Sequence, residues 1–86
     1  MMKVWQPSND EINKTTEWGI WTKEPSEFPW HYDDTETCLI LEGSAEVTDS
    51  EGNKIQFKTG DMVQFRTGLS CTWKVTESLR KRYKFG

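Results

Sequence analysis

The fold is decided by the stretch Glu36-Thr37-Cys38-Leu39-Ile40-Leu41-Glu42-Gly43. Its residues favour extended backbone, a carboxylate stands near each end, and a glycine closes the run. Because side chains alternate along a strand, Glu36 shares one face with Cys38 and Ile40, and the other face begins with Thr37. Both faces are partly apolar, which predicts a strand that is covered on both sides. A carboxylate on such a strand requires a metal, a cation or a hydrogen-bond network as its partner.

The composition of the whole chain also favours strands. Its 86 residues include eighteen β-branched side chains of Val, Ile and Thr, but a single alanine and four leucines. Five tryptophans are available to fill a small core that has few aliphatic side chains. A chain of this length forms one domain, and it buries a modest fraction of its surface. Association into a homodimer is therefore an expected source of further stability.

Charge and hydropathy argue against two broad classes of partner. A net charge of −3 creates no global basic field that would attract nucleic acid or anionic lipid. No apolar run approaches the roughly 20 residues of a transmembrane helix, and the N-terminus lacks the apolar core of a signal peptide. We therefore expect a cytoplasmic protein with no membrane partner. The two cysteines, Cys38 and Cys71, are too few for a disulfide framework.

Short strands are predicted at spacings near ten residues along the chain. They cover residues 1–5, 18–23, 28–33, 36–42, 44–48, 54–58, 62–66, 70–75 and 79–85. Ser8 followed by Glu11 resembles a capping box, which predicts a turn of helix through Ile12. Short strands at this spacing predict an all-β sandwich or barrel. We expect an N-terminal strand and helical turn, residues 1–17, to pack on a barrel domain, residues 18–86.

Two glycine-anchored segments carry a resemblance to a known superfamily. Glu36, six further residues and Gly43 match the end of the first cupin motif. The second motif is matched in its spacing by Gly60-Asp61, Phe65 and Gly68. The chain thus resembles a small single-domain cupin. This resemblance implies a double-stranded β-helix, or jelly-roll barrel, with a cleft inside one end of the barrel.

A narrower resemblance is to the (S)-ureidoglycine aminohydrolase-type cupins. That group also includes ethanolamine-utilisation cupins and many stand-alone proteins of unknown role. The match is carried by residues 30–33, 36–43, 60–65 and 72–75, together with Arg80, Lys81 and Tyr83. These motifs indicate the fold more specifically than any activity.

The superfamily resemblance also implies a metal site with two histidines and a glutamate from the first motif and one histidine from the second. Glu36 is retained. By the shorter allowed spacing the two histidine positions hold Trp30 and Tyr32, and by the longer spacing they hold Pro29 and His31. Both alignments stay open at this point. These departures predict a degenerate or absent metal site.

Cys71 stands where the second motif places its histidine. As a thiolate it could ligate a soft or borderline metal beside Glu36 and His31, the only histidine in the chain. A metal-dependent enzyme with a divalent transition metal held by Glu36, Cys71 and either His31 or Tyr32 is therefore the alternative function. The simpler interpretation makes Cys71 a small buried side chain beside Trp73, and His31 a surface residue.

The main expectation is a small-molecule site inside the barrel, centred on Glu36. The cations available to pair with this carboxylate are Arg66, Arg80 and Lys81. Strand alternation requires one of Arg80 and Lys81 to face inward. Aromatic walls with few polar groups suit a small organic or sugar-like ligand, although the same residues could simply form a core around a structural ion pair. Besides Glu36, the ligand-binding candidates are Trp30, Tyr32, Phe65, Cys71, Trp73 and Lys81.

A rival interpretation starts from the basic run Arg80-Lys81-Arg82-Tyr83-Lys84. Basic and aromatic side chains on strands are typical of barrels that bind single-stranded nucleic acid. The acidic net charge and the paired glycine motifs favour a cupin instead. The sequence therefore predicts a stand-alone cupin that binds a small molecule, and it assigns the protein no reaction.

Overall fold

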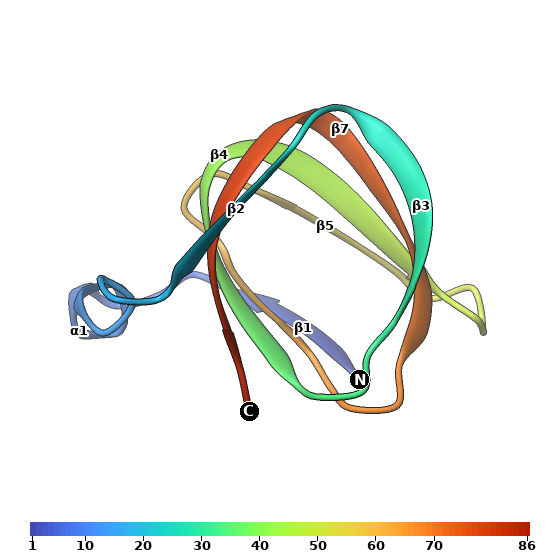
Figure 1. Cartoon of the computed structure of the whole chain (residues 1–86), viewed down its shortest axis with the longest axis horizontal. Coiled ribbons are helices and arrows are strands. Elements are labelled where there is room, and N and C mark those ends of the chain that lie inside the picture. The colour runs from blue at the N-terminus through green and yellow to red at the C-terminus, as the bar shows by residue number, and fades with distance from the viewer.

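The structure, a computed structural model, describes residues 1–86 and contains one short helix and seven strands. In chain order these are β1 (Met2–Trp5), α1 (Asn9–Asn13), β2 (Gly19–Lys23), β3 (Ser26–His31), β4 (Glu36–Asp49), β5 (Lys54–Lys58), β6 (Met62–Phe65) and β7 (Ser70–Phe85). The strands curve around a common interior, and α1 lies outside it (Figure 1). This is an all-β jelly-roll barrel, as the sequence predicts. No helix has the length and apolarity needed to cross a membrane.

Two long strands, β4 and β7, form the frame of the barrel. They pair antiparallel from Glu36 opposite Phe85 to Asp49 opposite Cys71. The first part of β4 pairs with β6 and its second part with β5. The first part of β7 pairs with β3 and its second part with β2, while β1 pairs with the free edge of β6. Each long strand therefore contributes to two parts of the barrel wall.

The prediction of separate strands on either side of residue 43, and of another break between residues 75 and 79, is wrong. Strand β4 continues through Gly43, and β7 continues through residues 76–78. The pairing register shifts between Ile40 and Ala45, as at a β-bulge, so the strand bends without ending. Gly43 has a φ of 89°, and a Cβ atom there would lie 2.1 Å from the carbonyl oxygen of Ser78. Glycine permits this bend and the close approach of β7.

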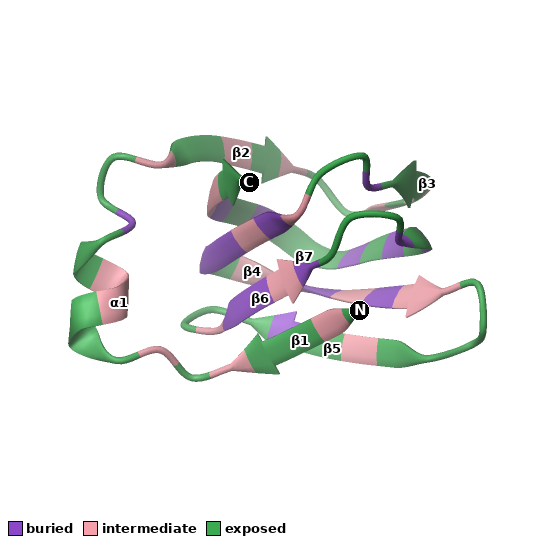
Figure 2. Cartoon of the chain, turned by 90° about the horizontal axis from the view of Figure 1, so that it is seen from below, coloured by how far each residue is buried: buried purple, intermediate pink, exposed green.

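The core lies on the inner face of the barrel. Buried side chains are concentrated on β4, β6 and β7 (Figure 2). Alternate residues of β7 point inward, so Cys71, Trp73 and Val75 are buried together as predicted. Phe65 packs between the rings of Tyr32 and Trp73, with centroids 5.1 and 5.2 Å away. Aromatic packing thus replaces the missing aliphatic volume.

Between β1 and β2 the chain runs outside the barrel (Figure 1). The predicted capping box is confirmed: Ser8 Oγ accepts from the Glu11 amide, and Glu11 Oε1 accepts from the Ser8 amide. The guanidinium of Arg82 donates to Thr15 Oγ1 at 3.0 Å on the outer face. Helix α1 itself lies apart from the strands (Figure 2). The division of the chain at residue 17 stays a prediction.

Candidate functional site

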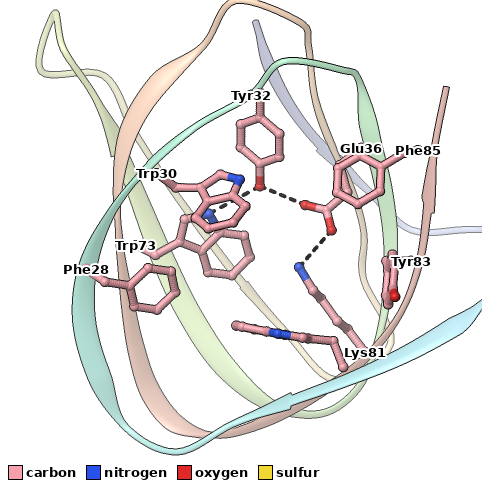
Figure 3. A pocket seen from close by; sticks show the side chains of 9 residues that line it. Phe28, Trp30, Tyr32, Glu36, Trp73, Lys81, Tyr83 and Phe85 are labelled. Carbon is pink, nitrogen blue, oxygen red and sulfur yellow. Dashed lines mark hydrogen bonds and ion pairs between the residues drawn. The ribbon is translucent and has the colours of Figure 1, made fainter.

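A cavity of about 230 Å³ lies among β2, β3, β4 and β7. Seven of its nine lining residues are aromatic, and the other two carry opposite charges. Figure 3 shows these side chains converging: Trp21, Phe28, Trp30, Tyr32, Glu36, Trp73, Lys81, Tyr83 and Phe85. Trp30 and Phe85 are half exposed, whereas Glu36 and Lys81 are each 4% exposed. The cavity therefore has an aromatic rim that meets solvent and a buried polar floor.

Strand pairing explains why these side chains meet. Trp21 of β2 lies opposite Lys81 of β7, and Phe28 of β3 lies opposite Trp73 of β7. Residues directly opposite one another in an antiparallel pair project from the same face. One long strand, β7, therefore supplies a wall residue from its first half and the cationic floor residue from its second half.

The polar floor is a connected hydrogen-bond network (Figure 3). Lys81 Nζ donates to Glu36 Oε2 at 3.0 Å, and the Tyr32 hydroxyl donates to Glu36 Oε1 at 2.7 Å. Trp73 Nε1 donates in turn to the Tyr32 hydroxyl oxygen at 3.3 Å. Both carboxylate oxygens thus have partners, and this buried charge meets the requirement that the sequence sets. Of the predicted cations, Lys81 is the one that faces inward.

Two indole rings surround the Lys81 ammonium. Its Nζ atom lies 4.7 Å from the ring centroid of Trp21 and 4.5 Å from that of Trp73. Such cation–π contacts strengthen when the cation is desolvated, as it is here. The ion pair and the two rings together fix the position of the Lys81 side chain.

The buried acids beside the floor retain their protons. Burial, and then the nearby Glu36 carboxylate, raise the pKa of Tyr32 far above its usual range, so the phenol remains a donor. Burial likewise raises the pKa of the Cys38 thiol, which is completely inaccessible to solvent. Neither group is available as a nucleophilic anion at neutral pH.

Five predicted ligand-binding residues meet in the cavity, and two do not. Glu36, Trp30, Tyr32, Trp73 and Lys81 line it.

Phe65 and Cys71 lie outside the lining. Phe65 is fully buried and supports Tyr32 from behind. The Cys71 thiol contacts the carbonyl oxygen of Trp30 at 3.6 Å, and burial raises its pKa to about 11. Both residues therefore support the site from the core.

The metal-ligating set of the alternative function, with Glu36, Cys71 and His31, is not assembled. His31 lies on the outer side of β3, where its Nδ1 atom is 2.8 Å from Ser70 Oγ and its Nε2 atom is 3.7 Å from Asp33. Strand alternation separates His31 from its inward neighbours. No three His, Cys, Asp or Glu side chains are grouped so that they could hold a metal ion. The donor residues of this chain do not fit the metal site implied by the superfamily.

The open choice between two motif alignments is also resolved. Trp30 and Tyr32 line the cavity, so the shorter spacing describes the structure. Neither side chain forms a metal shell with Glu36, because the Trp30 indole has no metal-binding lone pair and the Tyr32 hydroxyl donates a hydrogen bond to that carboxylate.

Four lining residues are absent from the sequence-based candidates: Trp21, Phe28, Tyr83 and Phe85. The sequence could have identified two of them. Tyr83 and Phe85 lie two and four residues after Lys81, so they face the same side of the strand. Trp21 and Phe28 face the cavity through their pairing with β7, which depends on the register.

The basic run near the C-terminus is divided between the inner and the outer face of the barrel. Lys81 points into the barrel, and Arg82 bonds to Thr15. Arg80 lies 3.7 Å from the Glu42 carboxylate on the outside. Alternation along β7 thus turns Lys81 inward and leaves Arg80 and Arg82 on the outer face, each with its own polar partner. The expectation that nucleic acid is not the partner stays a prediction.

Comparisons with solved structures agree with this architecture. A DUF861 family protein from Thermotoga maritima is 44% identical, with a TM-score of 0.97 and full coverage of both chains. The EutQ protein of Clostridium difficile gives a TM-score of 0.72 at 18% identity, covering 78% of this chain and 52% of that one. A putative ethanolamine utilization protein Q from Salmonella typhimurium gives 0.72 at 21% identity, covering 98% and 68%. These last two likenesses concern the fold alone.

No curated protein sequence matches the chain. The family model of the EutQ-like cupin domain matches residues 11–83, which is most of the barrel. Together with the Thermotoga maritima relative, this match identifies the family. The chain belongs to the EutQ-like cupin domain family.

Proposed function

We propose that this protein binds a small organic molecule in the aromatic cavity, with Glu36 and Lys81 at its floor. The observation that carries the proposal is a buried ion pair at the floor of a cavity whose rim reaches solvent. A buried ion pair is weak evidence for stability, because burying two charges opposes their attraction. An aromatic cavity with a few convergent polar groups is the usual form of a small-molecule site.

The size of the cavity limits the ligand. Its volume of about 230 Å³ lies below the roughly 300–1,000 Å³ of pockets for drug-sized ligands. We therefore expect a molecule of one or two rings, whose apolar part contacts the walls and whose polar end contacts the floor.

We propose binding and assign the protein no reaction. The aminohydrolase activity of the narrower group is not transferred, because the metal-binding histidines are missing and His31 faces away. The narrower family assignment, the cytoplasmic location and the homodimer stay predictions.

The test is a saturation-transfer NMR screen of the full chain with neutral one-ring and two-ring fragments, followed by chemical-shift mapping. We expect the bound fragments to perturb the backbone amides of Lys81 and Tyr83. Substitution Trp30→Ala at the rim should weaken binding about tenfold, equivalent to about 1.4 kcal/mol. The matched control, Ile20→Ala, changes an exposed side chain of β2 outside the cavity lining and should leave affinity unchanged.

Two results would count against binding in the cavity. One is a screen in which no fragment perturbs these amides. The other is equal affinity for the wild type and Trp30→Ala, which would place the bound fragments elsewhere on the protein.

A further inference from the structure

The charges of the cavity floor cancel locally. Lys81 Nζ and Glu36 Oε2 are 3.0 Å apart, and their side chains are only 5% and 6% exposed. A cationic ligand at the floor would meet the ammonium that already lies between two indole rings. An anionic ligand would meet the carboxylate. Because the pair has no net charge, a charged ligand would lose its hydration without gaining a free counter-charge, so the floor discriminates against both signs.

The floor nevertheless retains hydrogen-bonding capacity. The Lys81 ammonium has three N–H groups, one of which donates to Glu36. The Glu36 carboxylate accepts one bond at each oxygen, from Tyr32 and Lys81, and each oxygen has a second lone pair. Both charged residues line the cavity. A ligand therefore meets a donor and an acceptor side by side.

The spacing of this donor and acceptor suits one functional group. In a cyclic amide, the N–H and C=O groups leave adjacent ring atoms in the same direction. Their partners must then lie about one hydrogen-bond length apart, as Glu36 Oε2 and Lys81 Nζ do. The aromatic walls accept the flat ring that carries such an edge.

We propose that the ligand is a neutral, planar ring compound with a lactam edge, whose N–H donates to Glu36 and whose C=O accepts from Lys81. This inference rests on the proposed function, because it names the ligand class of the same cavity. It excludes carboxylates, phosphates and amines as the polar end of the ligand.

The experiment compares matched two-ring probes by NMR titration of the full chain. Quinolin-2(1H)-one has the lactam edge, N-methylquinolin-2(1H)-one lacks the donor, and quinoline lacks both the donor and the carbonyl. Naphthalene-2-carboxylate and naphthalen-2-ylmethylammonium carry the two charges. We expect quinolin-2(1H)-one to bind at least tenfold more tightly than each of the other four probes.

A double variant tests the assignment to the floor. Glu36→Gln combined with Lys81→Met removes both charges together, so neither is left buried without its partner. The preference for quinolin-2(1H)-one over its N-methyl form should fall below about threefold in this variant. If the variant does not fold, the wild-type protein decides the question: a tenfold preference together with a shift of the Lys81 amide supports the floor, and equal affinity of the two forms overturns the inference.

The outcomes separate the two proposals. Equal binding of all neutral probes at the cavity overturns the lactam inference and leaves the proposed function standing. Tightest binding of either charged probe at the cavity does the same. If no probe perturbs the cavity amides, both proposals fail.

Discussion

At the residue level, the stability of the cavity floor depends on two opposite charges that are almost fully removed from water. Lys81→Met keeps a long apolar side chain but leaves the Glu36 carboxylate buried without its cation. We expect the free energy of unfolding to fall by about 3–5 kcal/mol, because an uncompensated buried charge is strongly destabilising. Urea denaturation at pH 7 measures the change.

The control for this prediction removes the second charge as well. In Glu36→Gln combined with Lys81→Met, the amide oxygen still accepts from Tyr32, and no charge is left unpaired. Most of the lost stability should return. A single variant within about 1 kcal/mol of the wild type would show that the carboxylate finds another partner or solvent.

The sequence predicts the importance of Glu36 but not the identity of its partners. A carboxylate on a strand with two apolar faces needs a partner wherever the strand lies. Which cation fills that role depends on the register between β4 and β7, where Ile40 pairs with Lys81. A shift of one residue would turn Arg80 or Arg82 inward instead. Local sequence patterns do not determine that register.

At the level of secondary-structure elements, the bend of β4 depends on a backbone conformation that favours glycine. Gly43→Ala places a methyl group at a φ of 89° and 2.1 Å from the carbonyl oxygen of Ser78. We expect a loss of about 3 kcal/mol or more, from backbone strain together with displacement of β7. The free energy of unfolding in urea is the readout.

Gly60→Ala provides the matched comparison. Gly60 has a φ of 96°, yet nothing lies within 4 Å of the position that a Cβ atom would take there. Its substitution should cost only the left-handed backbone term of about 1–2 kcal/mol. Equal losses at Gly43 and Gly60 would contradict a steric role for the contact with β7.

The sequence locates most strands but divides the two longest ones. Alternating side chains and glycine-containing turns predict the regions of β1, β2, β5 and β6 well. Gly43 resembles a strand end in the sequence, because glycine at a turn and glycine at a bulge look alike. Only the continuing ladder between β4 and β7 distinguishes them.

At the level of the whole molecule, buried acidic protons make stability sensitive to alkaline pH. Burial raises the pKa values of Tyr32 and Cys38, and raises that of Cys71 to about 11. In the unfolded chain, the pKa of a thiol is about 8.5 and that of a phenol is about 10. The folded state therefore keeps protons that the unfolded state releases. The free energy of unfolding should keep its full value below about pH 8.5 and should fall as the pH rises toward the pKa values of the folded state.

Urea midpoints measured at pH 7, 8, 9 and 10 test this dependence. Each thiol that stays protonated in the folded state contributes a slope of at most about 1.4 kcal/mol per pH unit. Cys38→Ala should reduce the slope between pH 8.5 and 10, whatever its effect on absolute stability. A urea midpoint that stays constant or rises over this range would contradict the raised pKa values of the buried thiols and of Tyr32.

The barrel as a whole follows from features that the sequence carries locally. Strand spacing and the two glycine-anchored motifs predict the jelly roll, and the family match confirms the cupin assignment. The cavity is harder to predict, because its walls come from four strands that meet only after closure. Trp21 and Phe28 become wall residues through long-range pairing with β7.

The tryptophans of the cavity are an intrinsic fluorescent probe. Three of the protein's five tryptophans, Trp21, Trp30 and Trp73, line the cavity, and two of them lie against the Lys81 ammonium. Indole emission depends on the polarity and charge around the ring. Three of the five indole rings of this chain are therefore placed to respond to changes in the cavity. Entry of a molecule there, or rearrangement of the ion pair, can be followed in the unmodified protein.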